Sequence, residues 1–176
     1  NGRELDFNGG EYGPKLISDF ALDFVTRHRA EPFFLYYPML LTHDPFQATP
    51  DSKAWDPRLK SEQEQRDVKH FADMTEYMDK MVGRLVAKLE ELGLRENTLV
   101  VYMGDNGFEL GEHGFYDKRD AFETSIRVPM LAWAPGAIRG GLVVTQMVQN
   151  IDIAATLLEA AGVADRKSTR LNSSHV

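Results

Sequence analysis

Apolar residues recur along the chain in two different spacings, which predict alternating helices and strands. Spacing of three or four residues predicts helices over 15–29 and 61–92. Continuous apolar runs predict strands at 33–39 (FFLYYPM), 98–103 (TLVVYM) and 128–136 (VPMLAWAPG), and 150–163 (NIDIAATLLEAAGV) forms a closing amphipathic helix. Helices that alternate with continuously apolar strands predict an α/β fold, with a mixed, largely parallel central sheet and helices on both faces.

The composition supports a single globular core. The chain has 176 residues, of which 43% are hydrophobic and 27% are charged. Its apolar runs are too short for a membrane span, and without cysteine it has no disulfide framework and no thiolate chemistry. A net charge of -7 argues against nucleic acid as a partner, although a small anionic substrate needs only a local positive pocket.

The C-terminal end departs from this pattern. Residues 165–175 (DRKSTRLNSSH) form a polar, basic string that resembles the conceptual translation of a sequencing-adapter oligonucleotide. We therefore treat 165–176 as a non-native tail, so its Asn172 glycosylation signal and its basic cluster carry no meaning. The alternative is a genuine disordered tail. The remaining residues, 1–164, show no repeat and no linker, and form one domain or part of one.

The segment after the strand at 98–103 carries the strongest candidate chemistry. It reads MGDNGFELGEHGFYDKR, and it places Asp105 and Asn106 directly after the strand. In α/β sheets ligands bind at the carboxyl ends of strands, and a carboxylate beside an amide offers the hard oxygen ligands that calcium or magnesium prefers. The alternative is an ordinary Asp-Asn-Gly turn.

Further polar residues could join this edge of the sheet. His113 and Lys118 follow Asp105 in a glycine-rich loop, and His43 follows the strand predicted at 33–39. If the strands are parallel neighbours, these loops could bring a cation, an imidazole and an ammonium group together. Such a pocket suits a tetrahedral oxyanion, with the metal and lysine balancing its charge and a histidine moving a proton. A lone histidine beside a strand is otherwise a structural residue.

Other conspicuous residues favour structural roles. We expect Glu123 and Arg127 to pair on one helical turn, and Asp152 to cap the last helix. The regularly spaced methionines of 61–92 should face the core, whereas His28 and His70 should lie at the surface.

Several stretches, in order along 1–164, resemble the formylglycine-dependent (type I) sulfatases of the alkaline-phosphatase-like superfamily. They are PFFLYYPMLLTHDPF, GDNG, GEHGFYDK, RVPMLAWAPG and NIDIAATLLEAAGV. On this resemblance, 1–164 is the C-terminal portion of a sulfatase catalytic domain.

The resemblance implies hydrolysis of a sulfate ester, either a small molecule or a glycan. Asp105 and Asn106 would ligate the metal, calcium rather than magnesium. His43 and Lys118 would be catalytic, contacting the sulfate group and the bridging ester oxygen. His113 would join them in binding substrate, or else hold other site residues in place. Many members of the family are exported, which implies the periplasm or the extracellular space.

Two family motifs have no counterpart in the sequence. One is Cys/Ser-x-Pro-x-Arg, the source of the formylglycine nucleophile, and the other is the Asp-Asp pair that completes the metal site. Truncation at both ends is the simplest account, so we expect the fragment alone to be inactive and to bind calcium weakly. Two alternatives remain open: a phosphodiesterase or phosphonate monoester hydrolase of the same superfamily, and an inactive sulfatase-like binding module.

Overall fold

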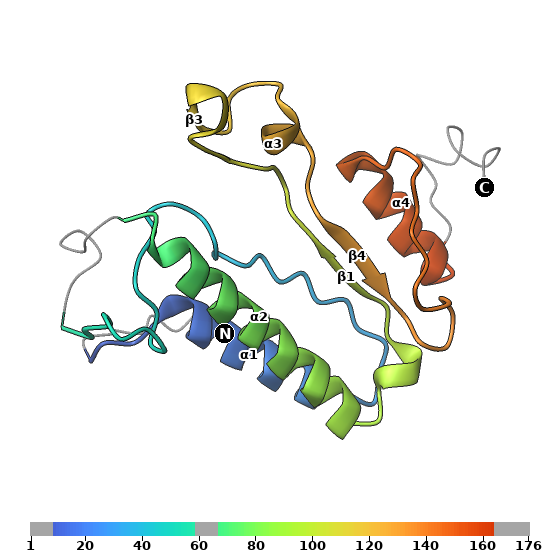
Figure 1. Cartoon of the computed structure of the whole chain (residues 1–176). Coiled ribbons are helices and arrows are strands. Elements are labelled where there is room, and N and C mark those ends of the chain that lie inside the picture. The colour runs from blue at the N-terminus through green and yellow to red at the C-terminus, as the bar shows by residue number, and fades with distance from the viewer. Residues whose placement is uncertain (1–8, 59–66, 164–176) are drawn as a thin grey trace. The chain divides into compact units, whose positions relative to one another are not determined.

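The chain divides into two compact units. The computed structural model describes residues 9–58 and 67–163, so the tail predicted at 165–176 lies outside the described residues (Figure 1). Unit 1 comprises 1–101 and 132–138, and unit 2 comprises 102–131 and 139–176. Each unit is described by itself below.

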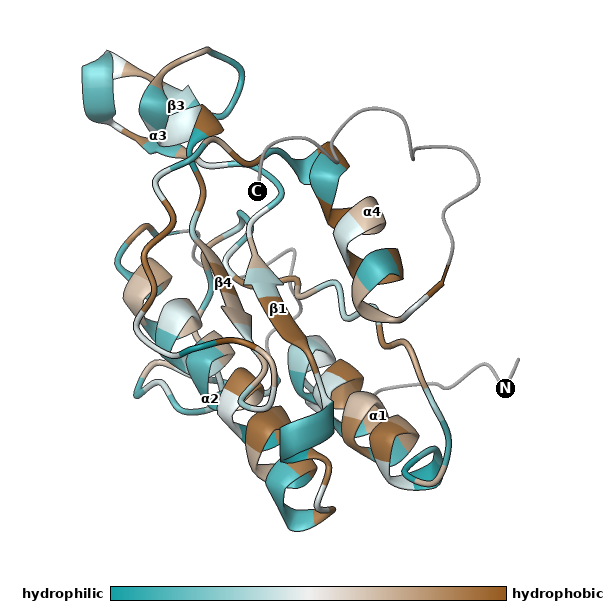
Figure 2. Ribbon diagram, turned by 90° about the vertical axis from the view of Figure 1, so that its right-hand side faces the viewer, coloured by the Kyte–Doolittle hydropathy of each residue, from teal (hydrophilic) through white to brown (hydrophobic). Residues whose placement is uncertain are grey.

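Two long helices form the core of unit 1. Helix α1 (Gly13–Arg27) packs against α2 (His70–Glu91), and the short helix η2 (Arg95–Asn97) follows. Figure 2 shows hydrophobic and hydrophilic residues alternating along both long helices, which is the amphipathic pattern of helices that share a core. The predicted methionine stripe lies in that core, because Met74 and Met81 are buried. Both helical predictions in this unit are confirmed in the described residues: α2 begins at His70, and the part of its predicted span at 61–66 lies outside the described residues.

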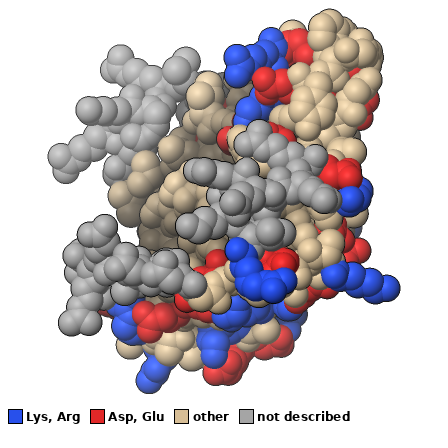
Figure 3. Space-filling view, turned by 90° about the vertical axis from the view of Figure 1, so that its left-hand side faces the viewer, with Lys and Arg blue, Asp and Glu red and all other residues tan. Residues whose placement is uncertain are grey.

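Charged side chains reinforce the contact between α1 and α2. Arg84 donates to Asp19 Oδ1 at 2.6 Å and to Ser18 Oγ at 3.1 Å. Burial alone would raise the pKa of Asp19, but hydrogen bonds from Lys15 and Arg84 outweigh it and leave the pKa lowered. Figure 3 shows basic side chains next to acidic ones along the lower part and the right-hand side of the face in view, consistent with surface charges that pair locally.

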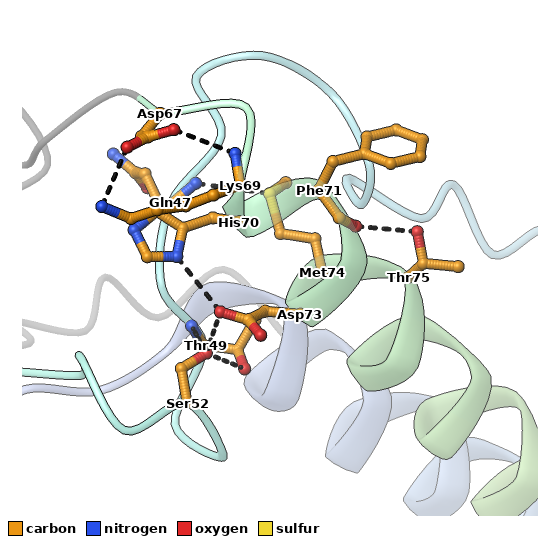
Figure 4. Close-up of polar contacts among 10 residues, drawn as sticks. All are labelled: Gln47, Thr49, Ser52, Asp67, Lys69, His70, Phe71, Asp73, Met74 and Thr75. Carbon is orange, nitrogen blue, oxygen red and sulfur yellow. Dashed lines mark hydrogen bonds and ion pairs between the residues drawn. The ribbon is translucent and has the colours of Figure 1, made fainter.

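A polar network joins the first turn of α2 to the preceding loop (Figure 4). His70 Nδ1 lies 3.1 Å from Asp73 Oδ2, and Ser52 Oγ donates to the same oxygen at 2.9 Å. Ser52 Oγ in turn accepts the backbone N–H of Thr49 at 2.8 Å. The surface position predicted for His70 is therefore wrong: the residue is only 5% exposed, because Asp73 and the loop cover it.

The strand predicted at 33–39 does not form among the described residues. The segment is extended, with alternate side chains half-buried and exposed, as expected for a chain with a period of two residues. Phe34 and Tyr36 point outward, with 71% and 76% of their surface exposed. A strand needs a hydrogen-bonded partner, which no described segment provides here, and Pro38 lacks a backbone N–H. The apolar pattern identified the extended conformation but not its pairing.

The described strands form two-stranded sheets. Strand β1 (Val100–Met103) pairs with β4 (Met130–Trp133), which confirms both predicted strands. Their arrows point in opposite directions in Figure 1, and the N–H of Gly104 donates to the carbonyl of Pro129 at 3.3 Å just beyond the pair. Strand β2 (Glu109–Leu110) pairs antiparallel with β3 (Tyr116–Asp117). The parallel part of the expected sheet is not among these described pairs.

Three helical segments complete unit 2. They are η3 (Glu112–Gly114), α3 (Glu123–Ile126) and α4 (Asn150–Ala160). Asp152 caps α4 as predicted, because its Oδ2 accepts the N–H of Gln149 at 2.9 Å while the Gln149 side chain caps in return. Within the described ranges, no helix is both long and apolar enough to cross a membrane.

The Asp73 network predicts a specific dependence of stability on pH. Hydrogen bonds from His70 and then Ser52 hold the pKa of Asp73 below its ordinary value of 3.8. The ionised carboxylate therefore stabilises the fold above that value, and this contribution is lost as the pH falls through the lower folded-state pKa. We expect the Tm of the wild type to fall more steeply with acidification than that of Asp73→Asn.

Thermal unfolding followed by circular dichroism between about pH 5 and pH 2 measures this difference. Asp23→Asn is the matched control, because Asp23 lies on the surface of α1 in an exposed ion pair with Arg27. Equal slopes for the wild type and Asp73→Asn would contradict the assignment.

Candidate active site

The turn after β1 holds both predicted metal ligands. Asp105 is exposed and Asn106 is half-buried. Asp105 Oδ1 accepts the N–H of Asn106 at 2.9 Å, so the residues do form the local turn that is the structural alternative to a metal site. Asn106 Nδ2 donates to the carbonyl of Gly107 at 2.7 Å. This bond fixes the orientation of the amide, because only its nitrogen can donate to a carbonyl. Oxygen atoms of both side chains can therefore serve as acceptors at the strand end.

Helix α4 contacts this turn from its first residue. Asn150 Nδ2 donates to the backbone carbonyl of Asp105 at 3.0 Å. This bond holds the main chain of Asp105 and leaves its carboxylate to other partners. The helix that closes the described chain thus helps to position the turn.

The chain leaving the turn lies directly against α3. The N–H of Gly107 donates to the carbonyl of Ser125 at 2.8 Å, and that of Phe108 to the carbonyl of Thr124 at 2.9 Å. A Cβ atom on Gly107 would lie 1.8 Å from the Thr124 carbonyl oxygen, far inside any real contact. Glycine is required at this position by the close approach of two backbones.

Lys118 follows a strained residue at the end of β3. Asp117 has a φ of 105°, which is costly for a residue with a side chain. Its Oδ1 accepts the N–H of Lys118 at 2.8 Å, and its Oδ2 pairs with Arg119 Nε at 2.9 Å. Those bonds hold the unusual backbone conformation and so fix the point from which the Lys118 side chain starts.

His113 lies in an aromatic cluster. Its ring stacks on Phe122, with centroids 4.1 Å apart and planes 13° apart, and Phe115 lies 5.9 Å from Phe122. The backbone of His113 has a φ of 55°, which belongs to the tight turn of η3. The structure thus gives the His113 ring a fixed face against Phe122.

His43 belongs to unit 1, whereas the other candidate residues belong to unit 2. It is exposed, and its Nδ1 lies 2.5 Å from the backbone carbonyl oxygen of Asp44. A carbonyl oxygen only accepts, so Nδ1 carries the hydrogen and Nε2 is the ring atom that can take up or release a proton. Four of the candidate residues therefore lie in unit 2, namely Asp105, Asn106, His113 and Lys118. His43 lies in unit 1.

A fully buried carboxyl group was missed by the sequence reasoning. Glu109 is 0% exposed, and the Thr124 hydroxyl donates to its Oε1. Neither residue belongs to a motif, so only a comparison of many related sequences could have singled them out. The predicted pair of Glu123 and Arg127 is confirmed at 3.8 Å, but both side chains are highly exposed and the pair contributes little.

The donor set at the turn fits part of a hard-cation site. A carboxylate and an amide oxygen are ligands suited to calcium, which takes six to eight oxygens. In the described part of the chain, no cluster of three or more His, Cys, Asp or Glu residues could hold a metal. Asp105 and Asn106 can therefore be only part of a complete ligand set.

Comparisons with known proteins agree on one family. A family model described as "Sulfatase" matches residues 3–163. N-acetylgalactosamine-6-sulfatase of Canis lupus familiaris is 35% identical over 155 residues, which cover 82% of this chain and 28% of that protein. N-acetylglucosamine-6-O-sulfatase of Bacteroides thetaiotaomicron is 43% identical over 86 residues, covering 49% of this chain and 15% of that protein.

A solved structure extends the likeness to the fold. The crystal structure of Ps i-CgsB in complex with k-i-k-neocarrahexaose matches with a TM-score of 0.76 and 30% identity, covering 98% of this chain and 38% of that one. The chain thus spans a minor part of the length of each of these proteins. Likeness over nearly the whole chain confirms the α/β fold class expected from the sequence.

The contact between Gly107 and Thr124 predicts opposite effects for two glycine substitutions. Gly107→Ala should destabilise the fold by about 1–3 kcal/mol, because the new methyl group meets a backbone oxygen that cannot move freely. Gly83→Ala should stabilise α2 by about 0.5–1 kcal/mol, because nothing lies within 4 Å of the added carbon.

Urea unfolding of both variants, followed by circular dichroism, measures the two effects. The contact would be refuted if Gly107→Ala proved as stable as the wild type while Gly83→Ala behaved as expected.

Proposed function

The chain belongs to the sulfatase family, and we propose that it supplies part of the active site of a sulfuric ester hydrolase. One observation carries the proposal: the segment from Asp105 to Lys118, which holds the candidate metal ligands and the candidate lysine, is fastened to α3 by backbone and side-chain hydrogen bonds. Because the chain spans only part of its relatives, the activity is that of a longer protein that contains it.

We propose that Asp105 and Asn106 hold a calcium ion together with oxygen ligands from elsewhere in that protein. The exposed carboxylate and the oriented amide fit calcium, whereas magnesium demands a stricter octahedron and retains more of its water. When bound, the cation supplies positive charge that offsets the charge of a sulfate group.

Lys118 and His43 have complementary roles in this proposal. The ammonium group of Lys118 binds a sulfate oxygen. His43, with Nδ1–H held by the Asp44 carbonyl, donates a proton from Nε2 to the bridging oxygen as the alcohol leaves. His43 must therefore enter the reaction as an imidazolium. His113 contacts the substrate from a ring that Phe122 keeps in a fixed plane.

The nucleophile must come from residues outside this sequence. The family uses a formylglycine made from cysteine or serine, and the 176 residues contain no cysteine and no Ser-x-Pro-x-Arg motif. The chain alone is accordingly expected to hydrolyse no sulfate ester.

The substrate we propose is a sulfated sugar. Both similar enzymes are named as sulfatases of an acetylated amino sugar, and the similar solved structure is a complex with a neocarrahexaose. These names favour sulfate esters over the phosphodiesters or phosphonates considered from the sequence. Export to the periplasm or extracellular space fits such a substrate and is part of the proposal.

Substitutions at Lys118 and His43 test the catalytic roles. In the longer protein, Lys118→Ala and His43→Ala should each lower kcat for a sugar sulfate by about 10²–10⁴-fold, because charge stabilisation and proton transfer are lost. Lys53→Ala, which removes an exposed lysine of unit 1, is the control and should leave kcat unchanged. Retained kcat in both site variants would refute these roles.

Calcium dependence tests the metal ligands separately. Removing divalent ions with a chelator should abolish activity, and added calcium should restore it. Asp105→Asn should raise the calcium concentration needed for half-maximal activity at least about tenfold, because a charged ligand becomes neutral. Asp23→Asn, on the surface of α1, should not change that concentration. An enzyme that keeps full activity in the chelator contradicts the metal proposal.

A further inference from the structure

The carboxyl group of Glu109 is unusual because it is buried without a full set of partners. The residue has no exposed surface, Thr124 Oγ1 donates to Oε1, and Oε2 is buried with no hydrogen-bond partner among the described residues. A buried carboxyl group that is incompletely hydrogen-bonded destabilises a fold, and an apolar side chain of similar size would fill the same space at lower cost. The position therefore calls for an explanation other than stability.

Glu109 lies in the chain between the candidate metal ligands and the candidate lysine. It follows the Asp105–Asn106 turn by a few residues and lies in β2, opposite Asp117 of β3. Asp117 is the strained residue that precedes Lys118. Glu109 thus lies between the candidate metal ligands and the candidate lysine, and both are linked to it through the main chain and the β2–β3 pairing.

Thr124 joins the same region to α3 in two ways. Its hydroxyl bonds to Glu109, and its carbonyl accepts the N–H of Phe108 at 2.9 Å. Figure 1 shows α3 beside β3 in unit 2. Because Thr124 forms one bond through its side chain and one through its main chain, α3 can neither rotate nor move away freely from the segment that contains Phe108 and Glu109.

The other side of α3 is tied to the chain just after Lys118. Ser125, which is 3% exposed, donates from Oγ to Asp120 Oδ1 at 2.9 Å, and the N–H of Phe122 donates to the same oxygen at 3.2 Å. Helix α3 is therefore bonded both to the segment that follows the metal turn and to the segment that follows the lysine.

We propose that Glu109 is a positioning residue: through Thr124 and α3, its buried carboxyl group holds the Asp105–Asn106 turn and the Lys118 backbone on one rigid frame. This inference rests on the proposed function for its consequence in catalysis. The frame itself is a property of this chain and can be measured without any activity. Glu109 acts through other residues and does not contact the substrate.

Matched variants separate positioning from stability. Glu109→Leu removes the buried carboxyl group and with it the acceptor for Thr124, whereas Glu109→Gln keeps an acceptor of similar size. Thr124→Val removes the donor and Thr124→Ser restores it. Should Glu109→Leu fail to fold, the pair of Thr124 variants tests the same bond.

Hydrogen–deuterium exchange on the full 176-residue chain measures directly how rigidly these segments are held. In Glu109→Leu and Thr124→Val, exchange in peptides covering 105–110 and 116–120 should rise at least about tenfold, while peptides of α2 are unchanged. Glu109→Gln and Thr124→Ser should resemble the wild type. Unchanged local exchange in both disruptive variants would overturn the proposal. An equal rise in exchange in Glu109→Gln and Thr124→Ser would overturn it as well.

Kinetics of the longer protein measure the effect of this positioning on catalysis. Glu109→Leu should lower kcat for a sugar sulfate at least about tenfold while its Tm is kept or raised, and Glu109→Gln should recover most of the activity. Loss of kcat that merely follows loss of Tm would overturn the positioning role. If the wild type hydrolyses no sulfate ester, the proposed function fails, and the exchange data still decide whether the frame exists.

Discussion

The contact between the main chains of Gly107 and Thr124 is the constraint on which the arrangement of unit 2 depends. Two backbones can approach so closely only when one of them carries no side chain, and the N–H groups of Gly107 and Phe108 then reach carbonyls of α3. The turn that precedes this contact holds Asp105 and Asn106, so the same contact determines where their oxygens lie. A motif that looks like a flexible turn in the sequence is in fact fixed on its downstream side.

The two units obtain their order from different interactions. Unit 1 has an apolar core between amphipathic helices, in which Val25 and Met81 are almost completely buried. In the described part of unit 2 the buried residues are Glu109 and Ser125, and both are hydrogen-bonded to neighbours. Directional polar contacts specify geometry more tightly than apolar burial, at the cost of desolvating polar groups.

Periodicity in the sequence was enough to find most elements, because amphipathic helices and buried strands impose their spacing on the residues. It failed at 33–39, where the extended conformation was correct but no described strand pairs with it, since pairing depends on distant residues. His70 was misplaced because a helical position does not reveal that a loop will cover it. The turn at Asp105 and the resemblance of the motifs predicted the proposed site. Glu109 could not be identified in this way, because its burial and its bond with Thr124 arise only in the folded chain.

We propose that this chain contributes metal and anion ligands to a hydrolase of sulfate esters. The most direct test of this proposal compares two esters of one sugar, N-acetylglucosamine 6-sulfate and N-acetylglucosamine 6-phosphate, as substrates of the longer protein in the presence of calcium. We expect a higher kcat/KM for the sulfate, which falls sharply when Asp105 or Lys118 is replaced by alanine. A higher kcat/KM for the phosphate, or hydrolysis of the sulfate that is indifferent to both substitutions, would contradict it.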